Sequence, residues 1–159
     1  MILTRLPAIA IVLFATVAAA QPAARPSSPD VETPPVWTRT LQMPDGRTFV
    51  SDGGLAVDAE IVKPASLPQT VIPPSSSKIV AGHLTAPHKT EIALADLRPG
   101  ARKNTFVGPG DISVNGNYVT LLRRTASRAR LRFRGNTDPI TIVVDERSVG
   151  VLMPLAPPR

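Results

Sequence analysis

Cysteine is absent from the 159 residues, which excludes a disulfide framework, a thiolate zinc site and a catalytic thiol. Aromatic residues make up only 4% of the chain, with one tryptophan and one tyrosine, so any hydrophobic core is mainly aliphatic. Hydrophobic residues reach 43% and charged residues 19%, a balance that excludes a chain disordered throughout. Together these values predict one modest domain that is stabilised by burial of aliphatic side chains.

Proline is abundant by contrast, with 18 residues against 10 glycines. This is more than twice the usual share of about 5%. Proline interrupts helices because it lacks a backbone N–H and its ring clashes with the preceding turn. We therefore expect a mainly β fold, a small antiparallel barrel or sandwich of short strands, and not a helical bundle.

The first twenty residues have the pattern of a secretory signal peptide. Arg5 is the lone early charge, Leu6 to Ala20 is apolar, and the small residues before Gln21 suit cleavage. The alternative, an uncleaved membrane anchor, is disfavoured because about 15 apolar residues containing Pro7 are shorter than the roughly 20 needed to span a bilayer. We predict a signal peptide over residues 1–20 and an exported protein, periplasmic or secreted, with no transmembrane span after cleavage.

Three proline-rich stretches divide the rest of the chain: a tether over 21–35, a Pro/Ser-rich linker over 64–77 and a tail over 154–159. Between them lie a short segment, 36–63, and a β-rich domain, 78–153. Arginine outnumbers lysine 14 to 4, which together with the alanine and proline content indicates a GC-rich bacterial coding sequence.

Turn signals place the expected strands. Pro44-Asp45-Gly46-Arg47 separates two strands of a hairpin, and Asn115-Gly116 predicts a type I′ hairpin turn. Leu55–Val62 fits a strand or a helix equally well, and that choice stays open. The further strands are expected at Ile79–Leu84, Thr90–Leu97, Thr105–Val107, Ile112–Val114, Tyr118–Arg124, Arg128–Arg134, Ile140–Asp145 and Val149–Met153.

The segment Arg128–Arg134 alternates arginine with apolar residues without a break. In an extended strand, four guanidinium groups about 6.8 Å apart stand on one face, with Ala129, Leu131 and Phe133 on the other. Nearby residues offer no obvious carboxylate to neutralise them. We therefore name an anion-binding site composed of Arg124, Arg128, Arg130, Arg132 and Arg134.

The chain contains 18 basic and 12 acidic residues, and this net positive charge favours an anionic partner. Candidate partners are an anionic envelope polymer, a lipid headgroup or an acidic protein. Nucleic acid is disfavoured because the chain lacks the aromatic residues on which bases stack. The structural alternative is a solvated face or a charged edge strand that guards against aggregation, with pairing to distant Asp96, Asp111 or Asp138.

Enzymatic sites are weakly indicated. His83 and His88, with Asp96 downstream, could form the centre of a metal-dependent or other hydrolase, but Pro87 between the histidines leaves only a loop geometry. Because ordinary surface histidines are far commoner than metal ligands in such a loop, no metal is predicted. No phosphate loop or dinucleotide fingerprint is present, so no cofactor is predicted. The favoured function is an exported non-enzymatic binding or structural protein of the cell envelope. A second alternative is an assembly subunit that binds by adding a β-strand.

Overall fold

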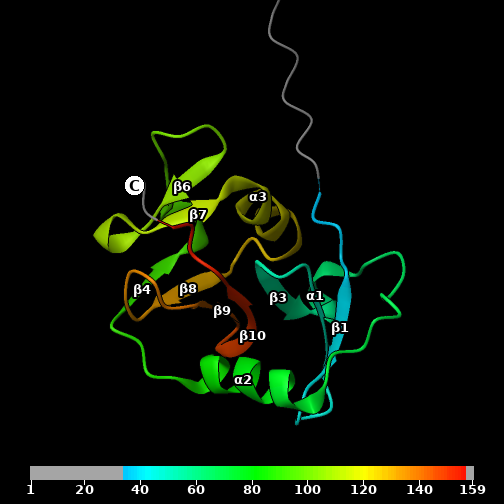
Figure 1. Ribbon diagram of the computed structural model, residues 1–159. Helices are drawn as coiled ribbons and strands as arrows, with labels where there is room; N and C mark the ends of the chain where they lie inside the picture. Colours follow the sequence, from blue (N-terminus) through cyan, green and yellow to red (C-terminus); the bar gives the residue numbers. More distant parts are fainter. Residues whose placement is uncertain (1–33, 157–159) are drawn as a thin grey trace, which may run out of the picture. The chain divides into compact units, whose positions relative to one another are not determined.

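The protein has a mixed α/β fold built on a seven-stranded antiparallel sheet and a three-stranded sheet (Figure 1). This computed structural model describes residues 34–156. The predicted signal peptide, most of the 21–35 tether and residues 157–159 of the tail lie outside that range. The expected antiparallel strands are confirmed, but the fold is mixed α/β and not mainly β, because helices α2 and α3 pack on the sheet. The expected barrel is wrong because the large sheet is open, with β1 and β4 as its two outer strands.

The order of the large sheet is β1-β2-β3-β10-β9-β8-β4. Its strands are β1 (Arg39–Gln42), β2 (Thr48–Ser51), β3 (Leu55–Asp58), β10 (Arg147–Leu152), β9 (Ile140–Val144), β8 (Arg130–Phe133) and β4 (Thr90–Ala93). The small sheet contains β5 (Arg98–Pro99), β6 (Thr105–Val107) and β7 (Ser113–Asn115). The helices are α1 (Ala59–Val62), α2 (Pro74–Thr85) and α3 (Gly116–Thr125), and the 3₁₀ turns are η1 (Leu94–Asp96) and η2 (Pro109–Asp111).

Strands from both sides of the proline-rich linker belong to the same sheet, because β3 pairs with β10. The 64–77 segment is therefore a connection within one sheet. Its residues 74–77 form the first turn of α2. The segment Leu55–Val62, for which strand and helix were both open, contains one of each: β3 ends at Asp58 and α1 begins at the next residue. The Asp58 side chain accepts a hydrogen bond from the Glu60 N–H, which caps this short helix.

Two segments predicted as strands are helices. Residues 79–84 lie in α2, which begins with Pro74 at its first position, where a missing N–H costs nothing. Residues 118–124 lie in α3, and the expected hairpin turn at Asn115-Gly116 is instead a helix start. The Asn115 side chain accepts a hydrogen bond from the Asn117 N–H at 2.9 Å, a standard N-cap.

Helices α2 and α3 lie on opposite sides of the large sheet (Figure 1). The larger core, on the α3 side, packs Val119 and Leu122 against sheet residues such as Leu131 and Ile142. The smaller core, on the α2 side, packs Leu84 against the residues Leu41, Met43, Phe49, Ala56 and Val151. The sheet is therefore buried on both faces. Across residues 34–156, no helix combines the length and apolar character that crossing a membrane requires.

Candidate functional site

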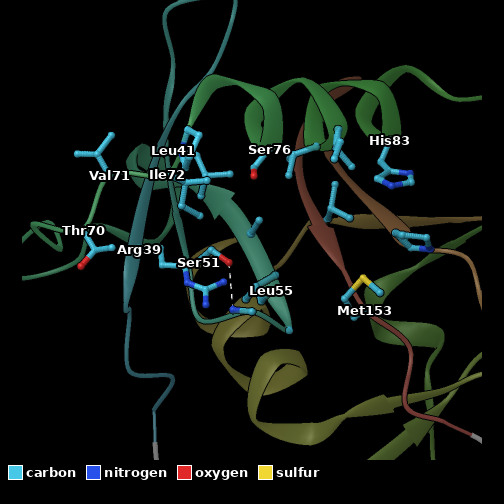
Figure 2. A pocket seen from close by; sticks show the side chains of 18 residues that line it. Arg39, Leu41, Ser51, Leu55, Thr70, Val71, Ile72, Ser76, His83 and Met153 are labelled. Atoms are coloured by element: carbon cyan, nitrogen blue, oxygen red, sulfur yellow. Dashed lines mark hydrogen bonds between the residues drawn. The ribbon is translucent and has the colours of Figure 1, made fainter.

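An open pocket of about 620 Å³ lies between α2 and the part of the sheet that carries β1, β3 and β10 (Figure 2). Volumes of roughly 300–1,000 Å³ are typical of small-molecule sites in proteins. Much of the lining is aliphatic, and two of its residues, Val71 and Ile79, are 63% and 64% exposed. The pocket therefore presents apolar surface that the fold itself does not cover.

One flank of α2 forms a wall of the pocket. The lining residues Ser76, Ile79, Val80 and His83 recur at the spacing of a single helix face. Ser77 and Leu84 are buried, so the helix uses a neighbouring face to pack on the sheet. Val80 also packs against the smaller core, whereas Ile79 on the same flank is left exposed.

The floor of the pocket is a row of paired strand residues. Arg39 pairs with Ser51, Ser51 pairs with Ala56, and Ala56 pairs with Val151. Side chains of directly paired residues stand on the same face of an antiparallel sheet, so this row faces α2. Arg39 lies at the outer end of the row, on β1, and Figure 2 shows its side chain and that of His83 towards opposite ends of the lining.

The turn before β3 closes the pocket near Arg39. The Asp52 carboxylate accepts hydrogen bonds from the Gly54 N–H at 3.0 Å, the Leu55 N–H at 2.9 Å and the Tyr118 hydroxyl at 2.8 Å. Burial and the hydrogen bond to Asp52 raise the pKa of Tyr118 to about 12, so the phenol stays a donor at neutral pH. A Cβ on Gly54 would lie 2.5 Å from the Tyr118 oxygen, so this close approach requires glycine. The turn is therefore held to α3.

His83 supplies a neutral polar group to the pocket lining. Its Nδ1 lies 2.7 Å from an Arg134 nitrogen, and a guanidinium can only donate, so Nδ1 accepts and Nε2 carries the proton. Burial and the positive charge of Arg134 lower the pKa of His83, which keeps the ring neutral at pH 7. The pocket is thus lined by a cation at Arg39 and an N–H donor at His83.

The predicted arginine strand is extended only in part. Arg130 and Arg132 lie on β8, whereas Arg128 lies in the turn before it, Arg134 follows its end, and Arg124 is in the last turn of α3. Leu131 and Phe133 are buried in the core on the α3 side, as the alternation predicts. The structure therefore places two of the five named arginines together on one strand face.

Contrary to the sequence expectation, these two arginines have acidic partners. Strand β4 pairs with β8 and places Glu91 directly opposite Arg132. Glu91 contacts an Arg130 nitrogen at 2.5 Å and forms a short ion pair with Arg132 Nε. Glu146 lies 3.6 Å from Arg130 and 3.5 Å from Arg132. The expectation failed because β4 and β8 are separated in the sequence by the entire small sheet and α3.

Glu91→Gln is expected to lower the free energy of unfolding by about 1–2 kcal/mol at pH 7. This value lies between the small effect of breaking an exposed ion pair and the large effect of breaking a buried one. The hydrogen bond from Arg132, opposed by burial and assisted by the charges of Arg132 and Arg130, lowers the pKa of Glu91. A lowered pKa contributes stability above the ordinary glutamate pKa, and that contribution disappears as the pH falls through the native pKa, below about pH 4.

Urea unfolding of both proteins at intervals from pH 7 towards pH 2 measures this effect. The difference between wild type and Glu91→Gln should shrink as the pH falls. The exposed Glu60, replaced by Gln, is the control and should change stability little at any pH. A difference for Glu91→Gln that stays constant across the range contradicts the assignment.

The candidate metal ligands do not converge. Among residues 34–156, no group of three histidine, aspartate or glutamate side chains is placed to hold a metal ion. His83 contacts Arg134, whereas His88 lies 3.8 Å from Glu91 and Asp96 lies in η1. The proposed hydrolase centre at His83, His88 and Asp96 therefore has no support in the geometry of this part of the chain.

The two outer strands of the large sheet differ. Residues 70–72 run along β1: the Thr40 N–H donates to the Thr70 carbonyl at 2.8 Å, and the Ile72 N–H donates to the Thr40 carbonyl at 3.0 Å. In the part of the chain that the structure describes, no strand pairs with the outer side of β4. Binding by strand addition stays a prediction, and β4 is where this part of the fold leaves room for it.

The pocket was missed from the sequence because its lining comes from separate parts of the chain, residues 39–56, 70–83 and 139–153. One local signal was present. Val71-Ile72 are aliphatic residues within a proline-rich stretch, and Ile79 continues the apolar character into α2. Comparison of the chain with known protein families, with curated proteins and with solved structures finds no match.

Proposed function

We propose that this chain is an exported, non-enzymatic binding protein of the cell envelope, and that its ligand site is the pocket between α2 and the sheet. The single observation that carries the proposal is the apolar pocket of about 620 Å³ with exposed Val71 and Ile79. The signal-peptide pattern of residues 1–20 supports export. An apolar small molecule is the class of ligand that such a lining favours.

Burial of apolar ligand surface supplies the binding energy. Each 100 Å² removed from water contributes about 2.5 kcal/mol, before the cost of association is subtracted. The few polar groups of the lining then set the orientation of the ligand. This division of roles is usual in small-molecule sites.

The test uses N-phenyl-1-naphthylamine, a neutral dye whose fluorescence rises in apolar surroundings. We expect saturable binding to the wild type and a loss of affinity of about tenfold in Ile79→Asp, because a carboxylate at the pocket wall must lose water when the dye binds. Ile79 is exposed, so the substitution should leave the fold intact.

Leu67→Asp is the matched control, since Leu67 is also exposed, at 51%, but does not line the pocket. It should bind the dye like the wild type. Failure of the wild type to bind the dye in a saturable manner, or an equal loss in both variants, overturns the proposal.

The arginine strand is kept as a second candidate surface for an anionic envelope polymer, a lipid headgroup or an acidic protein. The observation that favours it is exposure: Arg128 is exposed, and half of the Arg130 side chain is exposed despite its contacts with Glu91 and Glu146. An external anion must compete with these two carboxylates. Binding there should weaken steeply with salt and on joint replacement of Arg130 and Arg132 with Gln. Binding that is indifferent to both contradicts this candidate.

A further inference from the structure

We infer that the pocket takes an amphipathic monoanion, a ligand with one apolar body and one anionic group, and that Arg39 binds the anionic group. This inference rests on the proposed function and adds the chemical class of the ligand. It follows from the charge of the lining, the position of Arg39 and the absence, within residues 34–156, of a carboxylate that pairs with Arg39.

Among the residues that the structure describes, the lining carries one full positive charge and no negative one. None of its eighteen residues is aspartate or glutamate. Its other polar side chains are the hydroxyls of Ser51, Thr70 and Ser76 and the neutral His83, which offers an N–H donor. A cationic ligand would find no counter-charge here, whereas an anion meets a guanidinium.

Arg39 is available to a ligand. It is exposed, and no carboxylate within residues 34–156 lies within ion-pair distance of it. Asp52, which lies in the chain between the lining residues Ser51 and Gly53, accepts hydrogen bonds from Gly54, Leu55 and Tyr118. The guanidinium of Arg39 therefore keeps its donors for an oxyanion.

The geometry separates the charged end of the ligand from its apolar body. Arg39 stands at the β1 end of the floor row, and Ala56 and Val151 continue that row beneath α2. Ile79 and Val80 line the pocket from α2. A ligand with its anion at Arg39 thus extends its apolar body along the floor, under the helix.

Two dyes with the same ring skeleton test this inference. N-phenyl-1-naphthylamine is neutral, and 8-anilinonaphthalene-1-sulfonate adds one sulfonate. We expect Arg39→Gln to weaken binding of the sulfonate dye about tenfold and to leave the neutral dye unchanged, because only the sulfonate contacts the guanidinium. Arg128→Gln removes an equivalent exposed charge away from the pocket and should affect neither dye.

A second measurement uses an acyl chain. Dodecanoate, below its micelle-forming concentration, and dodecanol, below its solubility limit, compete with the neutral dye. In the wild type dodecanoate should displace it at a lower concentration than dodecanol, and Arg39→Gln should remove that difference.

Each outcome separates the two proposals. Saturable binding of the neutral dye, with no effect of Arg39→Gln on the sulfonate dye or on dodecanoate, overturns the inference and leaves the proposed function standing. An equal effect of Arg128→Gln also overturns it, since the anion would then respond to overall charge and not to Arg39. If neither dye binds, the proposed function itself is wrong.

Discussion

Leu131→Ala is expected to lower the free energy of unfolding by about 3 kcal/mol, because the truncation removes apolar contacts and leaves a cavity. Leu131 is fully buried at the centre of β8 and packs in the larger core on the α3 side of the sheet. Its neighbours in the chain, Arg130 and Arg132, stand on the other face. Urea unfolding at neutral pH measures the change.

Arg130→Gln on the same strand is the comparison. It removes a half-exposed ion pair with Glu91, which contributes about 1 kcal/mol or less. The alternation of β8 thus predicts a large effect at one position and a small effect at the next. Equal losses of stability at both positions would show that the two faces are not distinguished as described.

Gly150→Ala is expected to cost about 2 kcal/mol, since added bulk in a tightly packed sheet forces neighbouring groups apart. Gly150 lies in the central strand β10, directly after an irregularity in its pairing with β9. A Cβ there would stand 2.9 Å from the Ala56 carbonyl oxygen, 3.1 Å from the Ile142 Cδ1 and 3.2 Å from a Val57 methyl. The carbonyl belongs to the backbone of β3, which cannot move aside without disturbing the sheet.

Gly82→Ala provides a control with the opposite sign. Gly82 lies inside α2, and a Cβ there meets no atom within 4 Å. Alanine should raise the free energy of unfolding by about 0.5–1 kcal/mol, because it restricts the unfolded chain and suits a helix. Thermal or urea unfolding of both variants checks the pair, and destabilisation by Gly82→Ala would contradict this account of α2.

Local patterns predicted several strands well. The hairpin around Pro44–Arg47 is confirmed as β1 and β2, and the alternation of Leu131 and Phe133 with arginine is confirmed in β8. In these segments the turn residues and the two-residue period indicate the same structure. Agreement between local signals of different kinds made them readable from the sequence alone.

The helices α2 and α3 were predicted as strands because a short aliphatic run fits the two-residue period of a strand as well as the 3.6-residue period of a helix. Residues 79–84 contain enough branched residues for a strand, but the buried positions Ser77 and Leu84 follow the helix period from a start at Pro74. At Asn115-Gly116 the same two residues suit a hairpin turn and a helix cap. Val119 and Leu122 are both buried and lie three residues apart, which is the spacing of one face of a helix.

The sites depend on distant pairings, which no local pattern contains. Glu91 neutralises Arg130 and Arg132 only because β4 and β8 are neighbours in the sheet. Arg39 reaches the pocket only because β1, β2, β3 and β10 align in one row. The residue types of a site could be named from the sequence, but which of them meet follows from topology.

Residues 70–72 form backbone hydrogen bonds with Thr40 on the outer side of β1, and this pairing affects how copies of the protein can associate. A fibre grows by stacking copies border to border, so every copy must offer two free borders to its neighbours. Within residues 34–156, the border at β1 is occupied at Thr40 by the backbone of residues 70–72. Two molecules that join through β4 would then present at each end a β1 border obstructed at Thr40, which opposes further lengthening through that sheet.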